Sequence, residues 1–124
     1  MSMPTILVAD DCQSVRLSIK RILEAAGYTV IVATNGEEAL ELLSKDPALV
    51  ILDVNMPCLD GFGFCEKLAE NPRHSDMPVV FCTTEKSMAL ELLGNTMGAY
   101  LQKPVDRESL LGVIQEQLLS KAGK

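Results

Sequence analysis

Short apolar runs alternate with amphipathic segments along this chain. Five apolar runs recur, at Thr5–Ala9, Thr29–Ala33, Leu49–Leu52, 78–82 and 99–102. The first four are rich in β-branched residues and nearly continuous in hydrophobicity, whereas a half-exposed strand alternates apolar with polar residues. Such runs are typical of parallel strands that are covered on both faces. The pattern therefore predicts five buried strands.

The segments between these runs have the period of an α-helix. After the first run, apolar residues line one face and charged residues the other (Val15, Ile19, Ile22 and Leu23 against Arg16, Lys20 and Glu24). Gly27 is expected to end this helix, because glycine readily takes the left-handed conformation that follows many helices. Three further helices are expected after capping side chains: 36–45 after Asn35, 61–70 after Asp60 and 107–121 after Asp106.

The alternation of strand and helix, repeated five times, predicts an α/β fold. Right-handed crossovers then favour one doubly wound, five-stranded parallel sheet with helices on both faces. The flavodoxin-like strand order 2-1-3-4-5 suits units of this size. No linker or internal repeat interrupts the chain, so residues 1–124 are expected to form one domain.

Charge and composition exclude several classes of function. The formal net charge is −6, and no basic cluster is longer than Lys20–Arg21. Direct binding of nucleic acid is therefore not expected. No apolar stretch approaches the ~20 residues that span a bilayer, and the start carries no basic leader, so a cytoplasmic protein without a membrane partner is expected. Four cysteines without a CxxC pair, and a single histidine, argue against zinc and favour free thiols.

The polar residues of most interest follow the predicted strands. Asp10 and Asp11 follow the first strand, and Asp53 follows the third. In open parallel sheets, ligands bind at the carboxyl ends of the strands where the winding reverses, which here lies between strands 1 and 3. Taken singly, each aspartate is more often a cap; taken together, they predict a functional cluster.

Such a cluster needs a counter-charge. Two like charges about 4 Å apart repel by roughly 4 kcal/mol at an effective dielectric constant near 20. Either one carboxylate takes up a proton or a cation lies among them. Oxygen ligands without histidine or cysteine favour a hard ion, and we expect Mg²⁺.

Two further strand ends add groups that suit a phosphoryl oxygen. Lys103 precedes Pro104 after the fifth strand, and Thr83 follows the fourth. A lysine facing three carboxylates could hold a phosphoryl oxygen as a point charge, and the threonine hydroxyl could donate to the same group. A carboxylate nucleophile, a metal, a cation and a hydroxyl together predict a phosphoryl-transfer site.

Four motifs in order carry a resemblance to a known family. They are ILVADD at 6–11, VILDVNMPCLDG at 50–61, VVFCTTE at 79–85 and YLQKP at 100–104. At these residues the chain resembles the receiver domain of bacterial response regulators in two-component signalling, of the chemotaxis-regulator kind. The resemblance covers essentially the whole chain.

The resemblance implies that Asp53 accepts a phosphoryl group from the phosphohistidine of a sensor histidine kinase or phosphotransfer protein, or from a small phosphodonor. It implies that Asp10, Asp11, Asp53 and the main-chain carbonyl of Asn55 hold Mg²⁺. Thr83 and Lys103 would then contact the phosphoryl group. The chain would catalyse its own phosphorylation and dephosphorylation, with no external turnover substrate.

The resemblance also implies a route for the signal. Tyr100 corresponds to an aromatic switch that turns inward when Thr83 moves, which changes the face formed by the fourth helix, fifth strand and last helix. That face would regulate an effector protein or a fused output domain. Asn55, Glu85 and Thr84 occupy positions that influence phosphate lifetime.

Some positions depart from the family pattern or fall outside the site. The segment between Thr83 and Lys103 is shorter than usual, so a short fourth helix is expected, and Val105 replaces a common aromatic residue. Cys65 and Cys82 are interpreted as packing residues. His74, in the polar turn 71–76, is interpreted as a solvent-exposed loop residue.

Three other functions are compatible with parts of this pattern. One is a receiver-like protein-docking module that acts without phosphorylation, against which the complete set of site residues argues. Another is an aspartate-nucleophile phosphatase, although such enzymes require a second aspartate as acid/base at the position that Asn55 occupies. A flavin-binding module fits the fold but lacks a Ser/Thr/Gly-rich phosphate loop.

Overall fold

The computed structural model describes residues 4–53, 59, 61–83, 98–103 and 105–122. In chain order the elements are β1 (Thr5–Ala9), α1 (Gln13–Ala25), β2 (Thr29–Ala33), α2 (Gly36–Leu42), a 3₁₀ turn (Leu43–Lys45), β3 (Leu49–Leu52), α3 (Gly61–Glu70), β4 (Val79–Thr83), β5 (Gly98–Gln102) and α5 (Arg107–Ala122). The expected fourth helix lies outside the described residues.

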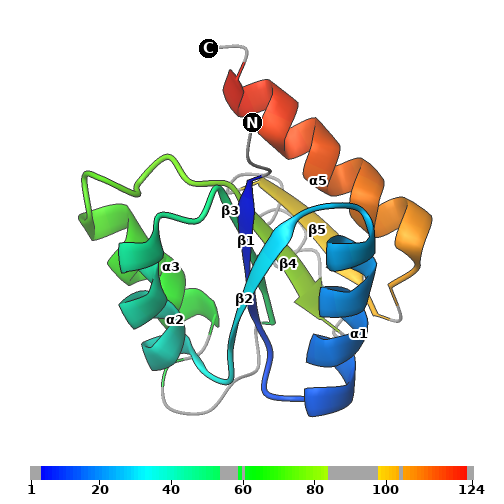
Figure 1. The fold of residues 1–124 in the computed structure, drawn as a ribbon. Coiled ribbons are helices and arrows are strands. Elements are labelled where there is room, and N and C mark those ends of the chain that lie inside the picture. The colour runs from blue at the N-terminus through cyan, green and yellow to red at the C-terminus, as the bar shows by residue number, and fades with distance from the viewer. Residues whose placement is uncertain (1–3, 54–58, 60, 84–97, 104, 123–124) are drawn as a thin grey trace.

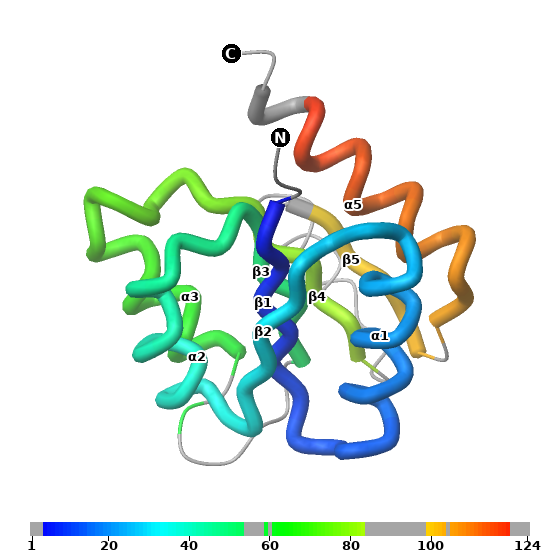
Figure 2. Tube along the Cα trace, viewed as in Figure 1, coloured from blue at the N-terminus to red at the C-terminus, as the bar shows by residue number. Residues whose placement is uncertain are grey.

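The five strands form one parallel sheet in the order β2-β1-β3-β4-β5, as the alternating pattern predicts. Helices α2 and α3 cover one face of the sheet, and α1 and α5 cover the other (Figure 1). Figure 2 shows the same layers along the backbone trace. The doubly wound, flavodoxin-like fold is confirmed.

The hydrophobic core consists of two layers, one on each face of the sheet. Successive residues of the central strands alternate between them: Leu7, Val50 and Val79 pack with α2 and α3, whereas Ile6 and Leu49 pack with α1 and α5. Every one of these side chains is inaccessible to solvent. Because side chains of a strand point alternately to its two faces, a sheet buried on both sides needs the continuous apolar runs seen in the sequence.

Most predicted boundaries agree with the structure. Gly27 has φ 101° and follows α1 as expected. The Asn35 side chain accepts the Glu38 amide at 2.9 Å, and the Asp106 side chain accepts the Ser109 amide at 2.7 Å, so both act as helix caps. Asp60 lies outside the described residues.

Several boundaries were predicted wrongly by one to three residues. The fourth strand is Val79–Thr83 rather than 78–82, because proline lacks the amide that the ladder needs, and the fifth is Gly98–Gln102 rather than 99–102. The helix expected over 36–45 tightens into the 3₁₀ turn after Leu42, and α5 ends at Ala122 rather than at residue 121. Among the described residues, no helix is both long and apolar enough to cross a membrane.

The prediction for His74 was wrong. Its exposed fraction is 8%, and Nε2 lies 3.2 Å from Asp46 Oδ1. Asp46 also accepts a hydrogen bond of 2.7 Å from Arg73 Nη2. This polar cluster links the segment before β3 to the segment before β4, which are far apart in the sequence. Local polarity of the turn could not reveal that contact.

Candidate functional site

The sheet ladder itself brings the polar strand ends together. The Asp10 amide donates to the Ala33 carbonyl at 3.1 Å, and the Asp53 amide donates to the Ala9 carbonyl at 3.0 Å. Both aspartates therefore continue the hydrogen-bond ladder by one residue beyond their strands. This fixes their Cα positions at the carboxyl edge of two neighbouring strands, β1 and β3.

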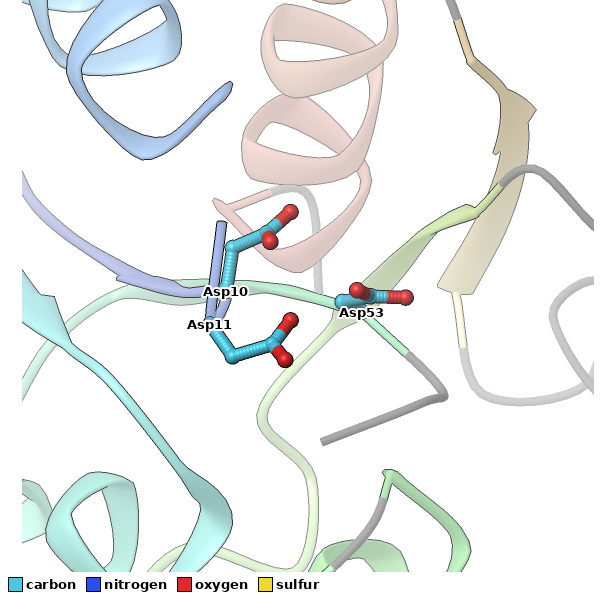
Figure 3. Close-up of side chains that lie close together, drawn as sticks. All are labelled: Asp10, Asp11 and Asp53. Carbon is cyan, nitrogen blue, oxygen red and sulfur yellow. The ribbon is translucent and has the colours of Figure 1, made fainter. Parts of the chain in front are cut away.

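Three carboxylates converge at that edge. Oxygen atoms of Asp10, Asp11 and Asp53 all lie within 4.8 Å of one another. Figure 3 shows Asp10 and Asp11 on consecutive positions after β1, facing the end of β3 that carries Asp53. Asp10 and Asp53 are 2% and 7% exposed, whereas Asp11 is exposed. The cluster thus has a buried wall and a side open to solvent.

Lys103 provides a cation in contact with this cluster. Its Nζ lies 2.7 Å from Asp10 Oδ2 and 3.4 Å from Asp53 Oδ2. Burial of the ammonium group opposes its charge. The hydrogen bond that the ammonium group donates to Asp10 and the negative charges of Asp10 and Asp53 outweigh burial, so the pKa of Lys103 is raised. One ammonium group faces three carboxyl groups, and the balance of charge favours a further cation.

The donor set fits a hard divalent ion. Every candidate ligand in the described cluster is a carboxylate oxygen, and a spacing within 4.8 Å allows all three residues to reach one ion. The exposed position of Asp11 leaves room for the waters that Mg²⁺ retains. Asp10, Asp11 and Asp53 are therefore chemically suited to hold Mg²⁺, as the sequence predicts. Asn55, whose carbonyl was expected to join them, lies outside the described residues.

Of the remaining predicted site residues, the structure describes Thr83 and Tyr100. Thr83 is fully buried at the end of β4, and its carbonyl accepts the Lys103 amide at 2.8 Å, which places it next to the lysine. Tyr100 is half-buried in β5, pairs with Phe81 and packs against the α2/α3 layer of the core. Thr84 and Glu85 lie outside the described residues.

Arg16 was not predicted to belong to the site. The helical pattern assigned it to the polar face of α1, but its Nη1 donates to the Asp10 main-chain oxygen at 2.7 Å. The side chain is half-buried as a result. An arginine at the end of the first turn of a helix that follows a strand can reach back to the strand end. That spacing is the signal that could have identified it.

A close backbone contact holds Leu59, two residues before α3. The Gly36 amide, at the start of α2, donates to the Leu59 carbonyl at 3.1 Å. A Cβ at position 36 would lie 2.1 Å from that carbonyl oxygen, so only glycine fits. The contact ties Leu59 to the start of α2.

Two cysteines near the cluster have contrasting surroundings. Burial raises the pKa of the Cys82 thiol to about 12, while Lys103 opposes that effect. Cys12 is exposed before α1, and its pKa is lowered by a hydrogen bond with Ser14 and by the Val15 amide. Cys12, Cys65 and Cys82 are free thiols, and Cys65 and Cys82 are buried packing residues as expected.

Comparison with known proteins identifies the family. Residues 6–115 match the model of the response regulator receiver domain. The chain therefore belongs to the response regulator receiver domain family, the receivers of two-component systems. The solved structure of the chemotaxis protein CheY4 of Vibrio cholerae superposes with a TM-score of 0.85 at 34% identity, covering 94% of this chain and 99% of that one.

Two sequence relatives are regulators rather than enzymes by name. The probable transcriptional regulator ycf27 of Porphyra purpurea is 40% identical over 116 residues, which cover 91% of this chain and 46% of that protein. Response regulator MprA of Mycolicibacterium vanbaalenii is 42% identical over 109 residues, which cover 86% of this chain and 46% of that protein. The chain thus spans about half the length of these relatives.

Proposed function

We propose that residues 1–124 form one receiver domain that works as a phosphorelay switch. Asp53 accepts a phosphoryl group from the phosphohistidine of a sensor histidine kinase or phosphotransfer protein, and the reaction depends on Mg²⁺. Phosphorylation then changes the surface that a downstream effector or a fused output domain recognises. The chain acts in the cytoplasm, without direct contact to nucleic acid or membrane.

One observation supports this role above the others. Lys103 Nζ lies within hydrogen-bonding distance of both Asp10 and Asp53, inside a group of three carboxylates that can share one cation. A structural cap has no need of such an arrangement. Two cationic groups around Asp53, one fixed and one exchangeable, match the negative charge that an incoming phosphoryl group brings.

The chemistry of the step follows from these groups. A carboxylate oxygen of Asp53 attacks the phosphorus atom, a new O–P bond forms while the N–P bond of the donor breaks, and the donor nitrogen keeps the electron pair. Asp10, Asp11, Asp53 and the Asn55 carbonyl would hold Mg²⁺. When bound, Mg²⁺ supplies positive charge that offsets the charge of the phosphoryl oxygens. Lys103 neutralises part of that charge from the β5 side.

The remaining site residues have proposed roles in the response. Thr83 donates its hydroxyl to the phosphoryl group and couples it to Tyr100, whose position in β5 is next to β4. This pair would bias a two-state equilibrium of the output face. Asn55, Thr84 and Glu85 would tune the lifetime of the acyl phosphate by controlling access of water.

The test is phosphorylation by a small phosphodonor such as acetyl phosphate. We expect intact-mass labelling of one phosphoryl group that requires Mg²⁺ and is lost in Asp53→Asn. The matched control is Asp46→Asn, which removes an aspartate at the opposite edge of the sheet and should leave labelling unchanged. Labelling that persists in Asp53→Asn would place the acceptor elsewhere.

A second measurement tests the switch. Mg²⁺ with beryllofluoride, which mimics a phosphoryl group on a carboxylate, should shift the amide resonances of Asp53, Thr83 and Tyr100. An unchanged spectrum at saturating reagent would contradict a switch. Labelling without those shifts would support phosphoryl acceptance but not the proposed route to Tyr100.

A further inference from the structure

Asp10 is held at each of its polar atoms. Its amide donates to Ala33, its carboxylate accepts the Cys12 amide at 2.9 Å and the Lys103 ammonium at 2.7 Å, and its main-chain oxygen accepts Arg16 Nη1 at 2.7 Å. The residue is 2% exposed. The first three contacts have simple explanations: the Ala33 contact continues the sheet, the Cys12 amide lies at the start of α1, and Lys103 is the counter-charge of the carboxylate. The fourth, from Arg16, needs a separate explanation.

The oxygen that Arg16 contacts belongs to the peptide group between Asp10 and Asp11. Because a peptide group is planar, holding its oxygen also fixes the direction of the bond from its nitrogen to the Cα of the next residue, Asp11. Asp11 needs such support. It is exposed and lies beyond the last residue pair of the β1–β2 register, Ala9 with Ala33. The strand ladder therefore does not orient Asp11, whereas the Arg16 bond constrains the peptide group that precedes it.

We propose that Arg16 is a positioning residue for the acidic site. Its guanidinium group holds the Asp10 carbonyl and thereby keeps the Asp11 carboxylate in reach of Asp10 and Asp53, ready to share a divalent cation. The inference rests on the proposed function, because it takes Mg²⁺ as the ion that these carboxylates hold. A hydrogen bond from a charged donor is strong enough to restrict a single peptide group.

The charge of Arg16 makes this role testable. A guanidinium group close to a cation site repels the cation, so its removal should strengthen Mg²⁺ binding if charge alone matters. Loss of positioning should weaken Mg²⁺ binding instead. The two effects have opposite signs, and the sign of the change therefore separates them.

The experiment compares variants at two arginines of α1. Arg16→Met removes both the charge and the hydrogen bond but keeps an apolar stem, and Arg16→Lys keeps a charged donor. Arg21→Met is the matched control, since Arg21 is exposed on the same helix and has no side-chain bond within the described part of the chain. Mg²⁺ affinity is measured by NMR titration of each full-length chain.

We expect Arg16→Met to weaken Mg²⁺ binding about tenfold, the loss of one hydrogen bond with a charged partner. Arg16→Lys should recover part of the loss, and Arg21→Met should stay within about twofold of the wild type. In the metal-free protein, amide hydrogen exchange should accelerate at Asp11 and Cys12 in Arg16→Met but not at Ile19 or Leu23. This last readout reports positioning without any metal.

Different outcomes overturn different statements. Equal or tighter Mg²⁺ binding by Arg16→Met, with wild-type binding and Asp53 labelling intact, overturns the role of Arg16 alone. Equal acceleration of exchange throughout α1 would show that Arg16 merely stabilises the helix, and would also overturn its positioning role. If Arg16→Met does not fold, Arg16→Lys gives the same comparison. No Mg²⁺ binding by the wild type would overturn the proposed function, and the Arg16 role with it.

Discussion

The two edges of the sheet each pair aspartate with basic residues, but in opposite environments. At the carboxyl edge, the side chains of Asp10 and Asp53 are 3% and 9% exposed, and that of Lys103 is 11% exposed. At the amino edge, the Asp46 side chain is 53% exposed and its partner Arg73 is 69% exposed. The distance between oppositely charged atoms is nevertheless the same, 2.7 Å, in the pairs Lys103–Asp10 and Arg73–Asp46.

The comparison shows that distance alone says little about the role of an ion pair. An exposed pair is worth roughly 0–1 kcal/mol, because water screens it and long side chains lose freedom. A buried pair contributes little net stability as well, yet removing one partner costs much more, because the other charge stays buried. The amino edge therefore ties two segments together, whereas the carboxyl edge concentrates charge that an ion and a phosphoryl group can use.

The largest expected effect comes from removing the buried cation. Lys103→Met leaves Asp10 and Asp53 buried without their partner, and should lower the free energy of unfolding by about 3–5 kcal/mol at neutral pH without Mg²⁺. Arg73→Met, the matched change at the amino edge, should lower it by about 1 kcal/mol or less. Urea unfolding of both variants measures the difference. Equal losses would mean that the contrast in burial has no energetic consequence.

A second contrast concerns two glycines. Gly36→Ala places a methyl group 2.1 Å from the Leu59 oxygen, and should destabilise the protein by about 1–3 kcal/mol while displacing Leu59. Gly112→Ala in α5 meets no atom within 4 Å, and should stabilise the protein by up to about 1 kcal/mol. Thermal unfolding measures both changes. An unchanged unfolding temperature for Gly36→Ala would show that the backbone at Leu59 can move away without energetic cost.

The effect that is smallest at neutral pH is a pH dependence next to the acidic site, which develops only in alkaline solution. The pKa of buried Cys82 is raised from 9.0 to about 12, so above pH 9 the unfolded thiol loses its proton while the folded one keeps it. The unfolded state then binds fewer protons, and stability falls as pH rises between 9 and 12, by at most about 1.4 kcal/mol per pH unit.

Cys82→Val isolates that contribution. Urea unfolding at pH 8, 9, 10 and 11 should show a shallower decline for the variant than for the wild type. Cys12→Ser serves as a control of opposite sign: because the pKa of Cys12 is lowered in the folded protein, removing this thiol should leave the decline as steep as in the wild type or slightly steeper, never shallower. Parallel curves for Cys82→Val and the wild type would contradict the assignment.

Much of the fold could be predicted from the sequence because it depends on local patterns. Continuous apolar runs such as Leu49–Leu52 indicated strands buried on both faces, and caps such as Asn35 marked helix starts. The ends of strands moved by one residue, at Pro78 for example, because pairing with a neighbouring strand decides where a ladder begins. Asp10, Asp11 and Asp53 could be grouped because parallel strands end at one edge.

What the sequence determined, then, is the order of the sheet and the set of charges at its carboxyl edge. Tertiary structure alone decided that Lys103 lies closer to Asp10 than to Asp53, and that Asp46 contacts His74 at the opposite edge. The strands and helices follow from periodicity along the chain, and the strand order follows from the doubly wound topology that their alternation favours. A contact between side chains distant in sequence depends on how the packed layers place them, and no local pattern records it.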